Sequence, residues 1–320
     1  MISVVIPVHN HGAFVEGAVD AFLRQTRPPR EIVLVDDAST DDTAARIAGL
    51  AARHPAVRAV RLARNGGPNV AIQCGLKVAT GAFVTAAAAD DRVTPIFLAR
   101  SVAALEAHPA AALCFSDPGE LIAETGARRD HLLGIADGPA YFAPAALARL
   151  MRRNLFTISS NTVVYRREAL DAVGGFRPEL AWHADWFANL VLGFRHGACY
   201  VPAVLAYFRV TAGSYSWTGA RDRAGQRRLL LDVIDVLRTE FPDVYPQIRR
   251  SALVPEMRLR DMGWLLGSPG HRRHLTARLA GRLLAREAWT HLRPMTPLSL
   301  RRGMRRLAGR ATSPARGTGA

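Results

Sequence analysis

The first 116 residues alternate short apolar runs with segments of helical periodicity, and this alternation constrains the fold more than any other feature. The apolar runs of strand length are ISVVIPV at 2–8, EIVLV at 31–35, VRAVRL at 57–62, AFVTAAA at 82–88 and AALCFS at 111–116. Helical patterns separate them, at 14–25, after Asp41, at 69–79 and after Pro95. Strands that alternate with helices in this way form a mostly parallel sheet, so we expect a doubly wound α/β domain.

Polar side chains follow several of these strands at the point where each strand ends. They are His9 and Asn10 after the first run, Asp36 and Asp37 after the second, and Asp90 and Asp91 after the fourth. In open α/β sheets the ligand lies beyond the carboxyl ends of the strands, so we expect these residues at one binding edge. The alternative for Asp36 and Asp37 is that they only begin the turn to the next helix, for which Ser39 or Thr40 is the expected N-cap.

Glycine-rich phosphate loops are missing from the sequence. There is no G-x-G-x-x-G after the first strand and no G-x-x-x-x-G-K-[ST] anywhere, which argues against a dinucleotide-binding fold and against a P-loop. A divalent metal ion on a carboxylate is another way to hold phosphates. The adjacent Asp90 and Asp91 are therefore either part of such a site or a solvated turn.

Several motifs occur in a fixed order between residue 2 and about residue 210. They are SVVIPVHN, FLRQTRPPREIVLVDDASTDDT, RNGG, GLKVATGAFV, ADDRVTP, VGGF and ADW. This ordered set resembles the family 2 glycosyltransferases, which have the GT-A fold. The resemblance implies an inverting enzyme that moves one sugar from a nucleotide-diphosphate donor, expected to be a UDP-sugar, to a hydroxyl of a saccharide or lipid-linked acceptor in surface polysaccharide synthesis. The absence of Q-x-x-R-W favours addition of a single sugar.

The resemblance also implies roles for individual residues. Pro7 and His9 correspond to contacts with the uracil and ribose of the donor, and Asp37 to a contact with the base. Asp90 corresponds to the last acid of a D-x-D motif, which binds a divalent metal ion (Mn²⁺ or Mg²⁺) on the diphosphate. Arg209 corresponds to a basic side chain that closes on the diphosphate, and Asp185 to the catalytic base.

Two positions depart from the family pattern. Ala88 stands where the family usually has an acid two residues before Asp90, and Ala184 stands where Glu often precedes the base. The alternative function is therefore a catalytically impaired relative that binds a nucleotide-sugar or serves as a scaffold. Asp91 would either compensate for Ala88 or cap the helix that follows.

Aromatic residues surround the expected base. Trp182 and Trp186 suit the apolar face of a sugar, and core packing explains them equally well. His183 is either a second donor ligand or a surface histidine, and we favour the latter. Asn161 is a weaker candidate for substrate contact, in the expected strand and helix at 159–176.

The sequence divides into a catalytic domain at 1–220, a basic helical region at 221–310 and a tail at 311–320 that we expect to be disordered. The donor half covers about 1–116 and the acceptor half about 140–220, and we expect the stretch 117–143, which contains several glycines and prolines, to be a flexible connection.

The net charge of +15 is concentrated in the last hundred residues. Residues 1–220 hold 21 basic and 19 acidic side chains, whereas residues 221–320 hold 21 basic and 8 acidic ones. Amphipathic arginine-rich patterns at 227–241, 271–292 and 300–310 suit an anionic membrane surface. A helical cap on the enzyme core and a nucleic-acid contact are the alternatives, and no nucleic-acid motif supports the second.

Three features bear on localisation. The chain begins with a strand pattern rather than a basic leader, it has no apolar run long enough to span a membrane, and its three cysteines lie far apart without metal-ligand spacing. We expect a cytoplasmic protein, peripheral on the inner face of the plasma membrane if the basic region docks there.

Overall fold

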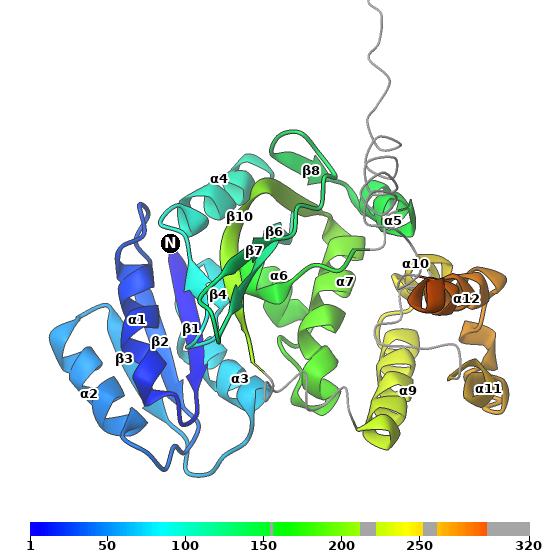
Figure 1. The fold of residues 1–320 in the computed structure, drawn as a ribbon. Coiled ribbons are helices and arrows are strands. Elements are labelled where there is room, and N and C mark those ends of the chain that lie inside the picture. The colour runs from blue at the N-terminus through cyan, green and yellow to red at the C-terminus, as the bar shows by residue number, and fades with distance from the viewer. Residues whose placement is uncertain (154–155, 212–221, 252–260, 293–320) are drawn as a thin grey trace, which may run out of the picture.

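The structure is a computed structural model that describes residues 1–153, 156–211, 222–251 and 261–292 (Figure 1). The predictions for 300–310 and 311–320 lie outside these residues. The strands are β1 (Ile2–Val8), β2 (Glu31–Asp36), β3 (Val57–Arg61), β4 (Phe83–Ala86), β5 (Arg92–Val93), β6 (Leu113–Ile122), β7 (Arg128–Asp130), β8 (Ala140–Phe142), β9 (Val164–Arg166) and β10 (Ala198–Val210). The α-helices are α1 (Gly12–Leu23), α2 (Thr43–Arg53), α3 (Pro68–Val78), α4 (Phe97–Ala107), α5 (Pro144–Arg153), α6 (Arg167–Ala172), α7 (Ala184–His196), α9 (Arg223–Thr239), α10 (Tyr245–Ser251), α11 (Asp261–Leu266) and α12 (Ala277–Leu292). The 3₁₀ turns are η1 (Ser160–Thr162), η2 (Pro178–His183) and η3 (Arg272–His274).

One mixed sheet organises the described residues, in the order β3-β2-β1-β4-β9-β6-β10-β5, with β7 paired to β6 and β8 to β10. The pairs β1–β2, β2–β3, β1–β4 and β6–β10 are parallel, whereas β9, β5, β7 and β8 run antiparallel to their neighbours. This confirms the predicted mostly parallel α/β sheet and places the ends of β1, β2 and β4 side by side.

The pleat of β1 explains why helices cover both faces of the sheet. Val4 and Ile6 point to one face and belong to the core cluster that includes α1, α2 and α4, whereas Val5 points to the other face and belongs to the cluster that includes α3, α6 and α7. All three side chains are fully buried. A strand buried on both faces needs a nearly continuous apolar sequence, as ISVVIPV provides.

The expectation of a flexible connection at 117–143 is wrong for 117–122, 128–130 and 140–142, which form strands. Strand β6 continues through Pro118 and Gly119 to Ile122, and β7 folds back on it. A Cβ at Gly119 would collide with the Tyr207 ring of β10, so this glycine permits close packing rather than flexibility. The buried Asp117 further fixes the strand, because its Oδ1 accepts hydrogen bonds from the Tyr200 hydroxyl and the Leu133 amide.

The predicted cap of the second helix is also wrong. Helix α2 begins after Asp42, and neither Ser39 nor Thr40 caps it. The Ser39 hydroxyl instead accepts a hydrogen bond from the Asn10 amide, at 3.0 Å. The side chain is thus used to connect the ends of β1 and β2.

The described part of the basic region packs partly on the catalytic domain. Val233 and Leu237 of α9 and Ile248 of α10 join the large core that contains α7. Leu279 and Leu283 of α12 form a separate small cluster with Leu265. Helices α9 to α12 lie together at one side of the sheet domain (Figure 1). Within the described residues, no helix has both the length and the apolar character needed to cross a bilayer.

Candidate active site

His9 and Asp37 form a connected network at the ends of β1 and β2. The Nδ1–H of His9 donates to the Asp37 carbonyl at 2.9 Å, which leaves Nε2 to accept from the Asn65 amide at 3.0 Å. The two carboxylate oxygens of Asp37 accept from the amides of Gly66 and Gly67, at 2.7 and 2.8 Å. The Asp37 carboxylate is buried, and these two hydrogen bonds fix the loop before α3.

Backbone strain accompanies this network. Asn10 and Ala38, the residues beyond the ends of β1 and β2, have φ values of 52° and 54°, in the left-handed region that residues other than glycine rarely adopt. Asn10 is fixed there because its side-chain oxygen accepts from the Thr40 amide at 2.9 Å. Strain of this kind persists where the surrounding contacts determine the conformation, as they do here.

Pro7 lies in β1 opposite Val35 of β2, and is half-buried. The pairing of β1 with β4 extends only from Ile2 to Val5, so the missing amide hydrogen of proline leaves no gap in that ladder. The structure thus brings Pro7, His9 and Asp37 to the same edge.

The loop after β4 carries Asp90 and Asp91, and β10 holds it in place. The Asp91 carboxylate accepts from the Arg209 amide at 3.1 Å, and Nε of Arg209 donates to the Asp90 carbonyl at 3.3 Å. The guanidinium of Arg209 also lies 5.1 Å from the centre of the Phe14 ring. Arg209 and the two acids therefore lie together.

Asp91 is not a helix cap, because α4 begins only at Phe97. Burial, and then repulsion from Asp90, raise the pKa of the Asp91 carboxyl to about 7. The Asp90 carboxylate accepts no hydrogen bond from any described residue, so it is available to an external cation.

Asp185 lies in the first turn of α7. Burial raises the pKa of its carboxyl above the usual range, while a hydrogen bond from Ser160 and the amide of Trp186 act in the opposite direction. Ser160 in turn accepts from the Asn189 amide at 3.0 Å, and Asn189 accepts from the Tyr165 hydroxyl at 2.8 Å. A half-buried carboxylate with a raised pKa, fixed by such a network, suits a general base.

Asp185 also lies close to the end of β4. Its partner Ser160 belongs to η1, and the Thr85 hydroxyl of β4 donates to the Val163 carbonyl immediately after η1, at 2.8 Å. Asn161 of the same turn accepts from Ser159, and its amide nitrogen is buried with no partner among the described residues.

The preference for a surface His183 is wrong, since only 3% of its surface is exposed. Burial lowers its pKa to about 4, so the ring is neutral at physiological pH. Its Nε2 accepts a hydrogen bond from the Gln226 amide at 2.9 Å, and the Trp182 Nε1–H donates to the same glutamine at 2.6 Å. Gln226 was missed in the sequence because no local pattern connects a glutamine in α9 to residues 43 positions earlier.

The described residues contain no group of three or more His, Cys, Asp or Glu side chains that would hold a metal ion without further ligands. Mg²⁺ and Mn²⁺ in nucleotide sites are commonly held by one or two carboxylates together with substrate phosphates. The unpaired Asp90 carboxylate beside Asp91 fits that kind of binding, in which the protein supplies only one or two of the ligands.

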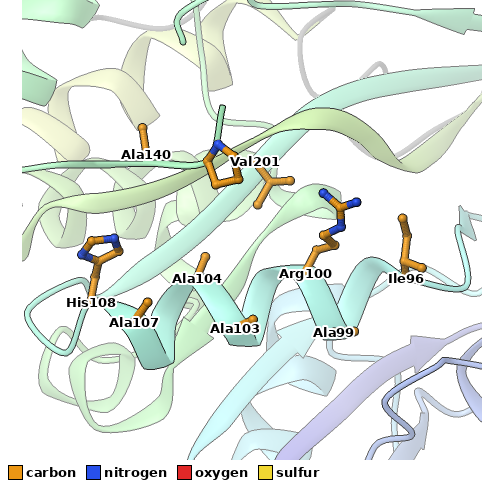
Figure 2. A pocket seen from close by; sticks show the side chains of 10 residues that line it. Ile96, Ala99, Arg100, Ala103, Ala104, Ala107, His108, Ala140 and Val201 are labelled. Carbon is orange, nitrogen blue, oxygen red and sulfur yellow. The ribbon is translucent and has the colours of Figure 1, made fainter. Parts of the chain in front are cut away.

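A shallow apolar pocket of about 400 Å³ lies along α4 (Figure 2). Ile96, Arg100, His108 and four alanines line one side, and Pro139, Ala140 and Val201 line the other. None of the predicted site residues belongs to it.

Comparison with known proteins agrees with this architecture. The structure of S. aureus TarS in complex with UDP superposes with a TM-score of 0.58 at 17% identity, covering 87% of this chain and 82% of that one. The mannosyltransferase PcManGT from Pyrobaculum calidifontis, in complex with GDP-Man and Mn²⁺, gives a TM-score of 0.55 at 19% identity, covering 90% and 86%. The fold is that of the GT-A glycosyltransferases.

The sequence comparison identifies the family. The model described as glycosyl transferase family 2 matches residues 3–174, more than half of the chain, and the chain belongs to this family. YibD of Escherichia coli, named as an uncharacterized glycosyltransferase, is 27% identical over 195 residues, which cover 59% of this chain and 56% of that protein. The chain spans somewhat more than half the length of the curated relatives that it matches. Asp185 and Arg209 lie beyond the segment that the family model covers.

Proposed function

We propose that the chain is an inverting glycosyltransferase that moves one sugar from a nucleotide-diphosphate donor, a UDP-sugar, to a hydroxyl of a saccharide or lipid-linked acceptor. One observation carries the proposal: the unpaired Asp90 carboxylate lies beside Arg209 at the sheet edge where His9 and Asp37 also lie. A site for a nucleotide diphosphate needs this combination, because the phosphates require positive charge and the nucleoside requires polar contacts nearby.

The donor would bind along this edge. Pro7 and His9 would contact the uracil and ribose, and Asp37 would contact the base while its carboxylate holds the Gly66–Gly67 loop. Asp90 would hold a divalent metal ion, which neutralises charge on the diphosphate leaving group. Arg209 would add a second positive charge at the same phosphates.

Asp185 would remove the proton from the acceptor hydroxyl as the hydroxyl attacks the anomeric carbon. Inversion requires the attack to be in line with the departing diphosphate, so the base must face the opposite side of the sugar from Asp90. The buried environment that raises the pKa of Asp185 also makes the carboxylate a stronger base. The proton ends on the Asp185 carboxyl, and the electron pair of the broken bond ends on the diphosphate.

The experiment is a calorimetric titration of UDP with and without Mn²⁺, into the wild type, Asp90→Ala and the control Asp20→Ala. Asp20 is an exposed acid of α1 that pairs only with Arg24 among the described residues. Metal-dependent binding that Asp90→Ala abolishes and Asp20→Ala retains would support the proposal. UDP binding that depends on neither the metal nor Asp90 would instead favour a metal-independent enzyme or a binding-only relative. The second candidate is motivated by Ala88, which stands where the family usually has an acid.

The nucleobase of the donor is tested by the same calorimetric titration. Absence of UDP binding in the wild type would contradict the UDP-sugar assignment, and GDP would then be the next titrant. Transfer of sugar in an activity assay separates an enzyme from the catalytically impaired or scaffold alternative, because both would bind the donor.

The acceptor would be part of surface polysaccharide synthesis, and the basic helical region would hold the enzyme on the anionic inner face of the plasma membrane. Two observations support this placement: the excess of arginine in residues 221–320, and the exposed Leu266 and Leu284, with 59% and 52% of their surfaces accessible. Sedimentation with anionic but not neutral vesicles, weakened by Leu284→Glu, is the expected result. Binding to DNA in place of vesicles would contradict it.

A further inference from the structure

We propose that Gln226 of α9 is a positioning residue that holds Trp182 and His183 in place and thereby orients Asp185. This inference rests on the proposed function, since the role is defined through the catalytic base. It gives the C-terminal helical region a part in catalysis, which neither the family segment at 3–174 nor the sequence pattern of α9 indicates.

The side-chain amide of Gln226 forms hydrogen bonds with two consecutive residues, one through its oxygen and one through its nitrogen. Its oxygen accepts from the Trp182 Nε1–H at 2.6 Å, and its nitrogen donates to His183 Nε2 at 2.9 Å. Gln226 is 7% exposed and His183 is 3% exposed, so water does not replace these contacts. Buried hydrogen bonds of this kind specify one geometry, because loss of a partner leaves a buried polar group unsatisfied.

The protonation state of His183 completes the match. The Nε2 atom can accept from an amide only when it carries no proton, and the low pKa caused by burial keeps the ring in that state. The proton of the neutral ring is then on Nδ1. A side chain that forms hydrogen bonds with both the Trp182 and the His183 ring needs one acceptor and one donor at a fixed spacing. An amide supplies both, and a leucine supplies neither.

Asp185 is two residues beyond His183, and His183 is the N-cap residue of α7, which begins at Ala184. Only Ala184 lies between them, so a displacement of His183 would shift the first turn of α7, which carries Asp185. Ala181, immediately before the two rings, has φ of 41° and ψ of −125°, a strained conformation that external contacts must maintain.

Helix α9 is itself fixed at both of its ends. At the start, the Asp222 carboxylate accepts from the Gly225 amide at 3.0 Å, and a Cβ at Gly225 would collide with that carboxylate. At the far end, Glu240 forms an ion pair with Arg177 at 2.6 Å, directly before η2. The helix can therefore hold Gln226 in one position relative to the segment that it contacts.

The test compares Gln226→Leu, Gln226→Glu and the control Gln247→Leu with the wild type. Gln247 of α10 has a side-chain amide that makes no hydrogen bond with any described residue. Two quantities are measured on the full chain below its melting temperature: hydrogen exchange of the amides at 178–186, and kcat with the donor KM.

Gln226→Leu should accelerate exchange at 178–186 and lower kcat by about 10²-fold, with the donor KM unchanged within about twofold, because misplacement of a catalytic group affects the chemical step. Gln226→Glu keeps the acceptor for Trp182, so it should retain more kcat than Gln226→Leu. It also serves as the informative variant if Gln226→Leu fails to fold. Gln247→Leu should match the wild type in both measurements.

The proposal would be overturned if Gln226→Leu and Gln247→Leu had the same amide exchange rates and the same kcat. It would also be overturned if Gln226→Leu changed only the donor KM and left kcat unchanged. The exchange measurement needs no turnover. A wild type that transfers no sugar would therefore count against the proposed function, while unchanged exchange at 178–186 in both Gln226 variants would count against the positioning role.

Discussion

The side-chain amide of Asn69 donates a hydrogen bond of 2.6 Å to the carbonyl of Ala181. Asn69 lies in the first turn of α3, directly after the loop that Asp37 organises, and Ala181 lies four residues before Asp185. The bond therefore connects the sheet edge that holds His9 and Asp37 with the segment that carries the expected base, across 112 positions of the chain.

Asn69→Leu should lower kcat, because the strained backbone of Ala181 would lose a contact that maintains it. Gln73→Leu is the matched control: Gln73 lies one turn further along α3, and its amide donates to the Gly174 carbonyl at 2.6 Å, away from Asp185. Both variants should lose a similar amount of stability, about 1 kcal/mol, in urea unfolding. Equal kcat in the two variants would contradict the connection to the base.

Asp37→Asn should weaken UDP binding and destabilise the fold. Its two carboxylate oxygens accept from Gly66 and Gly67, and an asparagine would place an NH₂ group against one of these amides. A buried donor left without a partner costs about 1–3 kcal/mol. Asp41→Asn is the control, because Asp41 is exposed and accepts from Thr43 nearby. Calorimetry with UDP and urea unfolding of both variants measure the two effects, and tight UDP binding by Asp37→Asn would argue against a role at the donor edge.

The sheet could be predicted from the sequence because each of its first strands is an apolar run between turn or helix signals. The same logic failed for β6 beyond Ser116, where Asp117, Pro118 and Gly119 are typical loop residues. Tertiary contacts override the local preference there: Tyr200 satisfies the Asp117 carboxylate, and Tyr207 needs the space left by Gly119.

Individual site residues could be predicted only where a motif fixes them to the end of a strand. His9, Asp37 and Asp90 are of this kind, and each follows a strand whose end lies at the same edge of the sheet. Asn65 and Gln226 could not be predicted, because their partners lie 56 and 43 residues away. His183 was misplaced for a related reason: its burial depends on α9, which the sequence around residue 183 does not reveal.

Glu31 should make the stability of the protein depend on pH far from the candidate site. Burial alone would raise its pKa, but hydrogen bonds from Thr80, Arg58 and Ser3 outweigh burial and lower the pKa to about 2. A carboxyl whose pKa is lowered on folding stabilises the protein above its unfolded pKa of 4.5, and this stabilisation is lost as the pH falls toward 2.

Glu31→Gln should therefore cost on the order of 3 kcal/mol at pH 7, and the difference from wild type should shrink between pH 4.5 and pH 2. Urea unfolding at a series of pH values measures it. Arg27 also lowers the pKa of Glu106, but solvent screens this exposed ion pair, so Glu106→Gln should change the pH dependence much less than Glu31→Gln. A gap between Glu31→Gln and wild type that stays constant with pH would show that the pKa of Glu31 is not lowered.

Asp185 should set the acid limb of the pH–rate profile. A general base works only when it is ionised, so kcat should fall as the pH drops through the pKa of Asp185, which burial holds above the usual aspartate pKa of 3.8. Asp185→Asn should remove this limb and lower kcat by about 10²–10⁴-fold while UDP affinity is retained. A large loss of UDP affinity would place Asp185 in donor binding instead.

Ser160→Ala provides the sharper test, because it changes the base without removing it. The Ser160 hydroxyl lowers the pKa of Asp185, so its loss should raise that pKa and move the acid limb of the profile to higher pH. Ser268→Ala is the control, since that hydroxyl donates to the Trp264 carbonyl in the remote helix α11. An acid limb that moves in Ser160→Ala and stays in place in Ser268→Ala would identify the titrating group as Asp185, whereas a limb unmoved in both would assign the titration to another group.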